Sequence, residues 1–251
     1  MRIKAHLSYH GSSFVGWQIQ AQGKTVQGEM EKAVQLFSGQ ATKVFGAGRT
    51  DAGVHAKDQV CHFDLSSPCD FRRLKRALNG ITPENIAVHH LEEVDESFHA
   101  RFSAHQKTYT YSYDYSDPAD IFQRETHYHV KNRELNFELM SKFMLLIKGT
   151  HDFSSFCSSQ NDTQSTTRTL VGAKIEHIPE ESKFYLSVEG KGFLQHMVRI
   201  IAGANLALAT GKITLDHIQQ ALASPQQRAL LGPTLPAHGL CLMKTQYISE
   251  S

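Results

Sequence analysis

The chain has 251 residues, of which 40% are hydrophobic and 20% charged, values that are ordinary for a globular protein of one large or two modest domains. No apolar run approaches the ~18–20 residues that a membrane-spanning helix requires. The net charge is +1, from 26 basic and 25 acidic residues. An anionic partner would therefore have to be attracted by a local cluster of charge rather than by the whole chain.

The cysteines and histidines form no pattern typical of a metal site or a disulfide framework. The four cysteines lie far apart, no Cys-x-x-Cys pair occurs, and none of the fifteen histidines belongs to a His-Glu-x-x-His motif. We expect reduced, mostly packed cysteines and no bound metal. The residues from Met1 to His6 lead directly into a strand-like pattern without the apolar core of a signal peptide, which favours a cytoplasmic protein.

The first hundred residues predict three strands and two helices. Alternating apolar residues indicate a strand over 3–9, and further strands are expected at 44–45 and 60–65 on either side of a glycine-rich loop. One helix is predicted between the capping residue Thr25 and Gly39, and a shorter one between Asp70 and Gly80. Their inward-facing residues at helical spacing are Val26, Met30, Val34 and Phe37, then Phe71, Leu74 and Leu78.

The rest of the chain predicts four more strands and three helices. The strand over 107–115 has the clearest pattern, with four tyrosines on one face: Tyr109, Tyr111, Tyr113 and Tyr115. Other strands are expected near 170–178, 184–189 and 239–247. Long helices are expected to end at Gly149 and Gly211, and a short one to begin at Thr214. The long helices carry Leu139, Phe143, Leu146 and Ile147, then Met197, Ile200, Ile201, Ala204 and Leu208.

Strands and helices do not alternate strictly along the chain, which argues against a doubly wound parallel sheet. We predict an α+β fold with a mixed, mainly antiparallel sheet. Each half of the chain offers a long helix, strands and a further helix. Two similar half-domains are therefore expected, spanning 1–104 and 105–251.

The segment Gly46–Gly53 contains the residues of greatest chemical interest. It superficially matches the dinucleotide fingerprint G-x-G-x-x-G, but Asp51 stands where that motif needs its last glycine, and no helix pattern begins there. The flanking glycines instead favour a tight loop that another part of the backbone can approach closely. From the loop alone, Asp51 is equally well explained by a hydrogen bond to its own turn and by catalysis.

The segment Gly48–Ala56, Gly-Arg-Thr-Asp-Ala-Gly-Val-His-Ala, resembles the signature of the bacterial tRNA pseudouridine synthase I family, in which this aspartate is essential. Other segments that resemble the family follow in register along almost the whole chain. They are Tyr9–Gly11, Phe14–Gln18, Val26–Glu29, Phe98–Ala104, Tyr109 with Tyr111, Gly149–Phe156, Arg168–Leu170, Phe193–Arg199 and Leu235–Leu240.

The resemblance implies the roles of individual residues. Asp51 would act on the ribose or the base, by attack at C1′, addition at C6 or proton removal from C2′. Arg199 would pair with Asp51 and keep it ionised, although a helix-end ion pair is the alternative. Tyr109 would lie against the uracil and help the C5 proton to leave, and Leu240 would close the base pocket; both could instead be core residues.

The resemblance also implies an enzyme that needs no cofactor and turns uridine into pseudouridine at positions 38–40 of the anticodon stem-loop of tRNA. The target nucleotide must be flipped out of its stack, and Arg49 would fill the gap or hold a phosphate. A homodimer is expected, with helices on one side of the sheet and a basic RNA-binding cleft on the other. Four basic residues of the 70–80 helix are either contacts to the tRNA backbone or a solvated helix face: Arg72, Arg73, Lys75 and Arg76.

Three departures from the family pattern change charges that would face RNA. His10 replaces a common acidic residue, Gln106 and Lys107 replace paired arginines, and Cys157 stands where an arginine often follows. Two other classes of function stay open: a catalytically silent tRNA-binding or tRNA-folding module, and a metal-free hydrolase that releases uracil from RNA.

Overall fold

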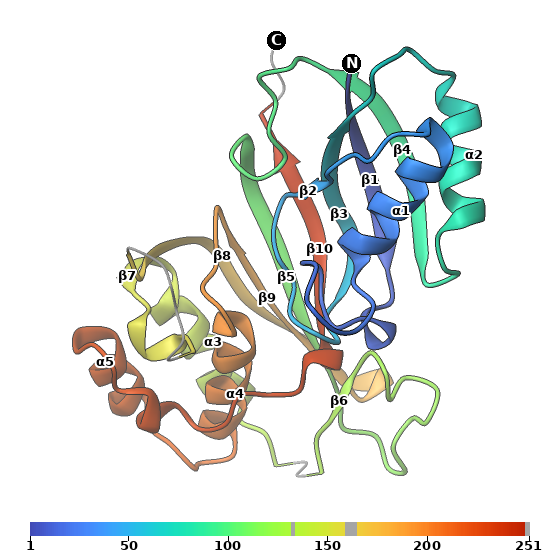
Figure 1. Ribbon diagram of the computed structural model, residues 1–251. Helices are drawn as coiled ribbons and strands as arrows, with labels where there is room; N and C mark the ends of the chain where they lie inside the picture. Colours follow the sequence, from blue (N-terminus) through green and yellow to red (C-terminus); the bar gives the residue numbers. More distant parts are fainter. Residues whose placement is uncertain (132–133, 159–164, 249–251) are drawn as a thin grey trace. The chain divides into compact units, whose positions relative to one another are not determined.

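The computed structural model describes residues 1–131, 134–158 and 165–248. Within those residues it contains ten β-strands, mostly antiparallel, and five α-helices, which confirms the predicted mixed α+β class. The chain forms two units, one made of Met1–His105 with the C-terminal segment from Cys241, the other of Gln106–Leu240. The segment 105–251 therefore contributes to both units. Figure 1 labels the elements of both units.

Unit 1 contains a sheet of four long strands in the order β4-β1-β3-β10. β1 pairs antiparallel with both β3 and β4, β10 runs parallel to β3, and the short β2 is added to β3. The elements are β1 (Arg2–Tyr9), η1 (Gly11–Ser13), α1 (Val26–Ser38), β2 (Phe45–Gly46), β3 (His55–Asp64), α2 (Phe71–Ile81), β4 (Ile86–Val94) and β10 (Leu240–Tyr247).

Alternation along β1 decides which face of this sheet the helices cover. Every second residue of β1 from Ile3 to Tyr9 is buried, while its neighbours remain half-exposed. α1 and α2 lie together on one face of the sheet (Figure 1). Both helices begin where the sequence predicts, because the Thr25 hydroxyl accepts a hydrogen bond from Gly28 N at 3.2 Å and Asp70 caps α2.

The strands of unit 2 follow the order β5-β9-β8-β7, with β6 added to β5. Its elements are β5 (Ala104–Asp114), β6 (Tyr128–His129), α3 (Phe137–Ile147), β7 (Gly149–Asp152), η2 (Ser154–Phe156), β8 (Thr167–Ile178), η3 (Pro179–Glu181), β9 (Lys183–Gly190), α4 (Met197–Ala209), α5 (Leu215–Ala223), η4 (Arg228–Leu231) and η5 (Ala237–Gly239). α3 packs on β8 and contacts both α4 and α5.

The tyrosines of β5 join this sheet to its helices. Tyr113 is fully buried, stacks on Phe184 of β9 with ring centroids 4.2 Å apart, and donates its hydroxyl to the Ala202 carbonyl of α4 at 2.9 Å. Tyr111 is also fully buried, and its hydroxyl donates to the Pro236 carbonyl at 2.8 Å. These rings therefore supply both apolar contact area and a satisfied polar end to the core.

Several strands depart from the sequence-based prediction, among them the short β6 and β7, which lie where no strand is predicted. β3 begins at His55 rather than near residue 60, because pairing with β1 extends it through a polar stretch that shows no alternation. β4 was missed altogether, since the register with β1 shifts beside His90 and interrupts the period-two pattern of Ile86, Val88 and Leu91.

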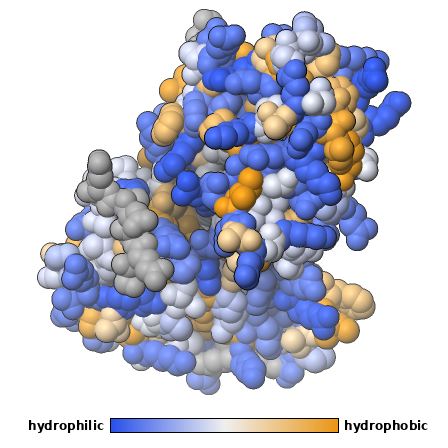
Figure 2. All heavy atoms as spheres, viewed as in Figure 1, coloured by the Kyte–Doolittle hydropathy of each residue, from blue (hydrophilic) through white to orange (hydrophobic). Residues whose placement is uncertain are grey.

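None of the helices among the described residues is both long enough and apolar enough to cross a bilayer. The face of the molecule drawn in Figure 2 is mainly hydrophilic, with apolar residues in small scattered groups. Apolar groups of this kind are ordinary on protein surfaces.

Replacing Gly203 with alanine tests the packing of α4. A Cβ at this position would lie 1.9 Å from the Pro233 carbonyl oxygen, so the backbone would have to move. We expect Gly203→Ala to lower the free energy of unfolding by about 1–3 kcal/mol. In α2, Gly80→Ala meets no atom within 4 Å and should instead stabilise by about 0.5 kcal/mol. Urea unfolding of both variants measures the difference, and equal midpoints would contradict the close approach.

Candidate active-site loop and its support

The Asp51 loop, residues 47–54, connects β2 to β3. Backbone hydrogen bonds join it to the segment that follows β1. Trp17 N donates to the Thr50 carbonyl at 3.1 Å, and Gly53 N donates to the Phe14 carbonyl at 3.3 Å. Within the loop, Val54 N donates to the Asp51 carbonyl at 3.1 Å. Backbone bonds on both sides of Asp51 therefore fix where its side chain starts.

Two glycines outside the loop allow this close approach. A Cβ on Gly11 would lie 2.1 Å from the Val54 carbonyl oxygen, and one on Gly16 would lie 2.8 Å from the Thr50 carbonyl oxygen. Gly16 also has a φ of +106°, which L-residues rarely adopt. The sequence predicts a loop that another part of the backbone approaches closely. In the structure that other part is the segment after β1, and its own glycines, Gly11 and Gly16, make the close approach possible.

A buried network of polar side chains holds the two residues on either side of Arg49. The hydroxyls of Tyr9 and Thr50 are 2.8 Å apart, and Gln59 Nε2 donates to Tyr9 Oη at 3.3 Å and to the Gly48 carbonyl at 3.0 Å. Burial raises the pKa of Tyr9, so this phenol stays protonated and can donate to Thr50. Side chains from the paired strands β1 and β3 thereby hold the loop.

His55 supports the loop from its C-terminal end. Its Nδ1 accepts a hydrogen bond from Gly11 N at 3.0 Å, so this nitrogen carries no proton in that bond. The His10 ring lies against the His55 ring, with centroids 4.4 Å apart and planes at 60°. The departure from the family pattern at His10 thus places a second aromatic ring, rather than a carboxylate, beside His55.

Within the loop, Asp51 is half-buried, Arg49 is exposed and Thr50 is buried. The basic residues predicted on the 70–80 helix lie on the exposed side of α2, whose Leu74 and Leu78 face the core. They are Arg72, Arg73, Lys75 and Arg76. Lys75 Nζ donates to the His89 carbonyl at 3.3 Å.

The remaining predicted site residues lie in unit 2. Tyr109 is opposite Val188 in the register of β5 with β9, is 7% exposed, and meets the edge of the Phe193 ring at 5.0 Å. Arg199 lies in the first turn of α4, where its Nε donates to the Leu235 carbonyl at 2.8 Å. Leu235 N donates back to the Arg199 carbonyl at 3.3 Å.

Arg199 and the strand that carries Tyr109 both contact one segment, residues 233–239. Leu240 follows it directly and is buried. Tyr111 lies on the same face of β5 as Tyr109 and donates its hydroxyl to the Pro236 carbonyl. Its ring also packs so closely on Gly239 that a Cβ there would lie 2.6 Å from it. One short stretch of chain is thus fixed both to the Tyr109 strand and to Arg199.

The sequence interpretation assigned no role to Tyr9, Gln59 or His55. One signal was present: alternation in β3 places Gln59 on the same face as Cys61 and Phe63, and a glutamine at a core position needs buried partners. Among the residues that the structure describes, no group of three or more His, Cys, Asp or Glu side chains is placed to hold a metal ion. The pairing of Asp51 with Arg199 stays a prediction.

Removing the Tyr9 hydroxyl tests the buried network. Tyr9→Phe takes a hydrogen-bond partner from both Thr50 and Gln59, so we expect a loss of about 1–3 kcal/mol in the free energy of unfolding. The amides of Trp17 and Gly53, which bond across the loop, should exchange faster with solvent. Tyr185→Phe, at a half-exposed position in β9, is the control and should change stability by less than about 0.5 kcal/mol. Unchanged exchange in Tyr9→Phe would show that the network does not hold the loop.

A family model described as tRNA pseudouridine synthase matches residues 5–103 and 144–248, which include Asp51, Arg199 and Leu240. A tRNA pseudouridine synthase A of Geobacillus sp. (strain WCH70) is 42% identical over 247 residues, which are 98% of this chain and 98% of the relative. Proteins of the same name are 39% identical in Brevibacillus brevis, over 246 residues, and in Streptococcus mutans serotype c, over 250 residues; each match covers 98% of this chain and 99% of the relative. The chain belongs to the tRNA pseudouridine synthase family, as the segment around Asp51 predicts.

Proposed function

We propose that this enzyme isomerises uridine to pseudouridine at positions 38–40 of the anticodon stem-loop of tRNA, and that Asp51 is its catalytic carboxylate. The observation that carries the proposal is the anchoring of the Asp51 loop. Hydrogen bonds hold the carbonyls of Gly48, Thr50 and Asp51 itself, and the loop lies within a segment that matches the family. A carboxylate held in advance needs little reorganisation when it reacts.

The reaction is a rearrangement within one nucleotide. The bond from C1′ to N1 breaks, a bond from C1′ to C5 forms, the C5 proton leaves to solvent and N1 gains a proton. Asp51 could begin it by attack at C1′, by addition at C6 or by removing a proton from C2′. Because no electrons or phosphoryl groups are transferred, the reaction itself demands no redox or nucleotide cofactor.

Arg199 is proposed to pair with Asp51. Its Nε donates to the Leu235 carbonyl, which orients the guanidinium plane, and a guanidinium can bind a carboxylate through two parallel hydrogen bonds. Such a pair would keep Asp51 ionised and limit its rotation. A pair of this kind fits a carboxylate that is half-buried and whose backbone is fixed.

Tyr109 and Leu240 are proposed to enclose the uracil ring. Chain connectivity supports the placement of Leu240, because it is bonded to Cys241, which lies opposite His55 in the register of β10 with β3. His55 in turn is four residues from Asp51 along the chain. Phe193 and Val188 hold Tyr109 in place, so its ring can offer a face or its hydroxyl to the base.

Extrusion of the target nucleotide from its stack costs a few kcal/mol. Arg49 is exposed directly beside Asp51 and is proposed to occupy the gap or to bind the neighbouring phosphate. The exposed basic side of α2 is proposed to contact the tRNA backbone, within a basic cleft. Its residues are Arg72, Arg73, Lys75 and Arg76. We expect the enzyme to act in the cytoplasm as a homodimer, and light scattering on the eluting gel-filtration peak measures its mass.

Tritium release from C5-labelled uridine in an unmodified tRNA transcript tests the reaction and its carboxylate together. Wild-type protein should release tritium, and Asp51→Asn should slow the release by about 10²–10⁴-fold or more, since an amide can act neither as a nucleophile nor as a base. Asp216→Asn, which changes an exposed carboxylate in the first turn of α5, is the matched control and should release tritium at the wild-type rate.

Two results would overturn the proposal. Free uracil in the wild-type reaction would identify a hydrolase instead, since isomerisation releases no base. Tight binding of the transcript without any tritium release would identify a silent tRNA-binding module.

A further inference from the structure

Four aromatic rings form a continuous patch on unit 1, here called the four-ring patch: Phe45, His62, His99 and Phe102. Phe45 stacks on His62 with centroids 5.0 Å apart, His62 meets His99 at 4.7 Å, and His99 meets Phe102 at 4.3 Å. The two phenylalanines at its ends are 44% and 72% exposed. Two large apolar rings thus face solvent, with the half-buried His99 between them in the chain of ring contacts and the buried His62 beneath.

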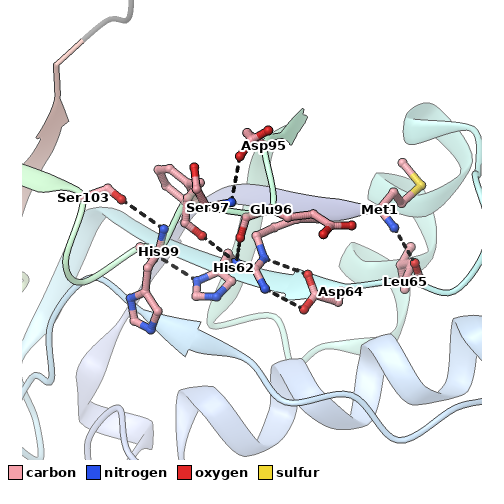
Figure 3. A network of polar contacts seen from close by, with 12 residues as sticks. Met1, His62, Asp64, Leu65, Asp95, Glu96, Ser97, His99 and Ser103 are labelled. Atoms are coloured by element: carbon pink, nitrogen blue, oxygen red, sulfur yellow. Dashed lines mark hydrogen bonds and ion pairs between the residues drawn. The ribbon is translucent and has the colours of Figure 1, made fainter.

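The turn that carries His99 and Phe102 is held rigidly by its neighbours. Arg2 binds Asp64 with two hydrogen bonds of 2.8 and 2.9 Å and donates to the Phe98 carbonyl at 2.9 Å. Tyr247 of β10 donates its hydroxyl to the Ala100 carbonyl at 2.7 Å. Figure 3 shows His62 and His99 close together within this network. Because the turn is already held in place, binding of a ligand to the patch would cost little conformational entropy.

Hydrogen bonds keep both histidines of the patch neutral. His62 Nδ1 accepts from Ala100 N at 3.1 Å, and His99 Nδ1 accepts from Arg101 N at 3.1 Å. Burial lowers the pKa of His62 to about 4, with the neighbouring His99 contributing, and burial also lowers the pKa of His99. At neutral pH the patch is therefore an uncharged aromatic surface.

Positive charge borders one end of this surface, and an exposed lysine precedes the other end in the chain. The Arg101 guanidinium is 5.9 Å from the centroid of the Phe102 ring, and the exposed Lys43 is two residues before Phe45. No Asp or Glu occurs within three positions of either phenylalanine in the sequence. Exposed aromatic faces bordered by cations match the chemistry of single-stranded nucleic acid, whose bases stack while its phosphates seek positive charge.

The patch is separate from the Asp51 loop. β3 runs from His55, beside the loop, to His62 in the patch, a span of seven residues and so about 23 Å at the rise of an extended strand. A base bound at the patch is therefore a different nucleotide from the one that reacts at Asp51.

We propose that the four-ring patch is a second RNA contact, on which an unstacked base of the tRNA stacks against Phe102 and Phe45 while Arg101 meets the adjoining phosphate. The proposal rests on tRNA being the substrate, but it does not depend on Asp51 being the catalytic group. Phe45 and Phe102 would bind any accessible base without selecting among the four bases, because every base offers a π-face.

An introduced tryptophan can report directly on stacking. The chain has one tryptophan, Trp17, which is buried, so Phe102→Trp adds a single exposed emitter at the patch. Titration with unmodified tRNA transcript should quench this added emission. Phe122→Trp, at a phenylalanine of unit 2 that is 92% exposed, is the matched control and should keep its emission.

Binding of the same transcript to alanine variants measures the contribution of the contact. Phe102→Ala should weaken binding about tenfold, the order expected for one lost base stack, whereas Phe122→Ala should bind as wild type. Arg101→Gln should lower the slope of log affinity against log salt by about one, since one phosphate contact is lost. Each measurement is repeated in the Asp51→Asn background, where binding is followed without turnover. A negative tritium assay would therefore not affect the binding results, and negative binding results would not affect the assignment of Asp51.

Three outcomes would overturn the proposal. The first is unchanged Phe102→Trp emission at tRNA concentrations that saturate binding. The second is equal quenching of Phe102→Trp and Phe122→Trp. The third is a blue shift of the Phe102→Trp emission that grows with protein concentration in the absence of tRNA, which would make the patch an interface between two copies of the chain.

Discussion

The buried phenol of Tyr9 in β1 is hydrogen-bonded both to Gln59 in β3 and to Thr50 in the Asp51 loop. The position of the loop on the sheet of unit 1 depends on these contacts. With Gln59, Tyr9 holds the backbone at Gly48 and the side chain of Thr50, so that Arg49 and Asp51 extend from a loop that is fixed beneath them. Such a network is costly to leave half-satisfied, because each polar group has given up water. The same bonds that stabilise the core therefore decide where the carboxylate stands.

In unit 2, two buried tyrosines of β5 hold the segments that carry the proposed site residues. Tyr113 and Tyr111 each bury a ring and place a hydroxyl on a carbonyl, one in α4 and the other at Pro236. Because Arg199 lies in the first turn of α4 and Leu240 follows Pro236 closely, the orientation of both depends on the same strand that carries Tyr109. In both units, residues proposed for chemistry stand on parts of the chain that buried hydrogen bonds have already fixed.

Charge in this protein acts locally. The net charge of +1 provides no general attraction for RNA, yet cations are exposed at Arg49, along α2 and beside the four-ring patch. The patch itself is kept neutral because main-chain amides occupy the Nδ1 atoms of His62 and His99. An RNA ligand would thus meet positive charge and aromatic surface at specific places, which favours defined contacts over non-specific adhesion.

The sequence alone determined the features that depend on neighbours in the chain. Caps at Thr25 and Asp70 locate α1 and α2, the alternation in β1 and β5 assigns their faces, and the segment around Asp51 identifies the family. Only the tertiary structure decided that β10, the last strand, inserts beside β3 in unit 1, that a register shift interrupts β4, and that Tyr9 and Gln59 hold the loop. These features rest on pairings and hydrogen bonds between residues tens to hundreds of positions apart, which leave no local period in the sequence.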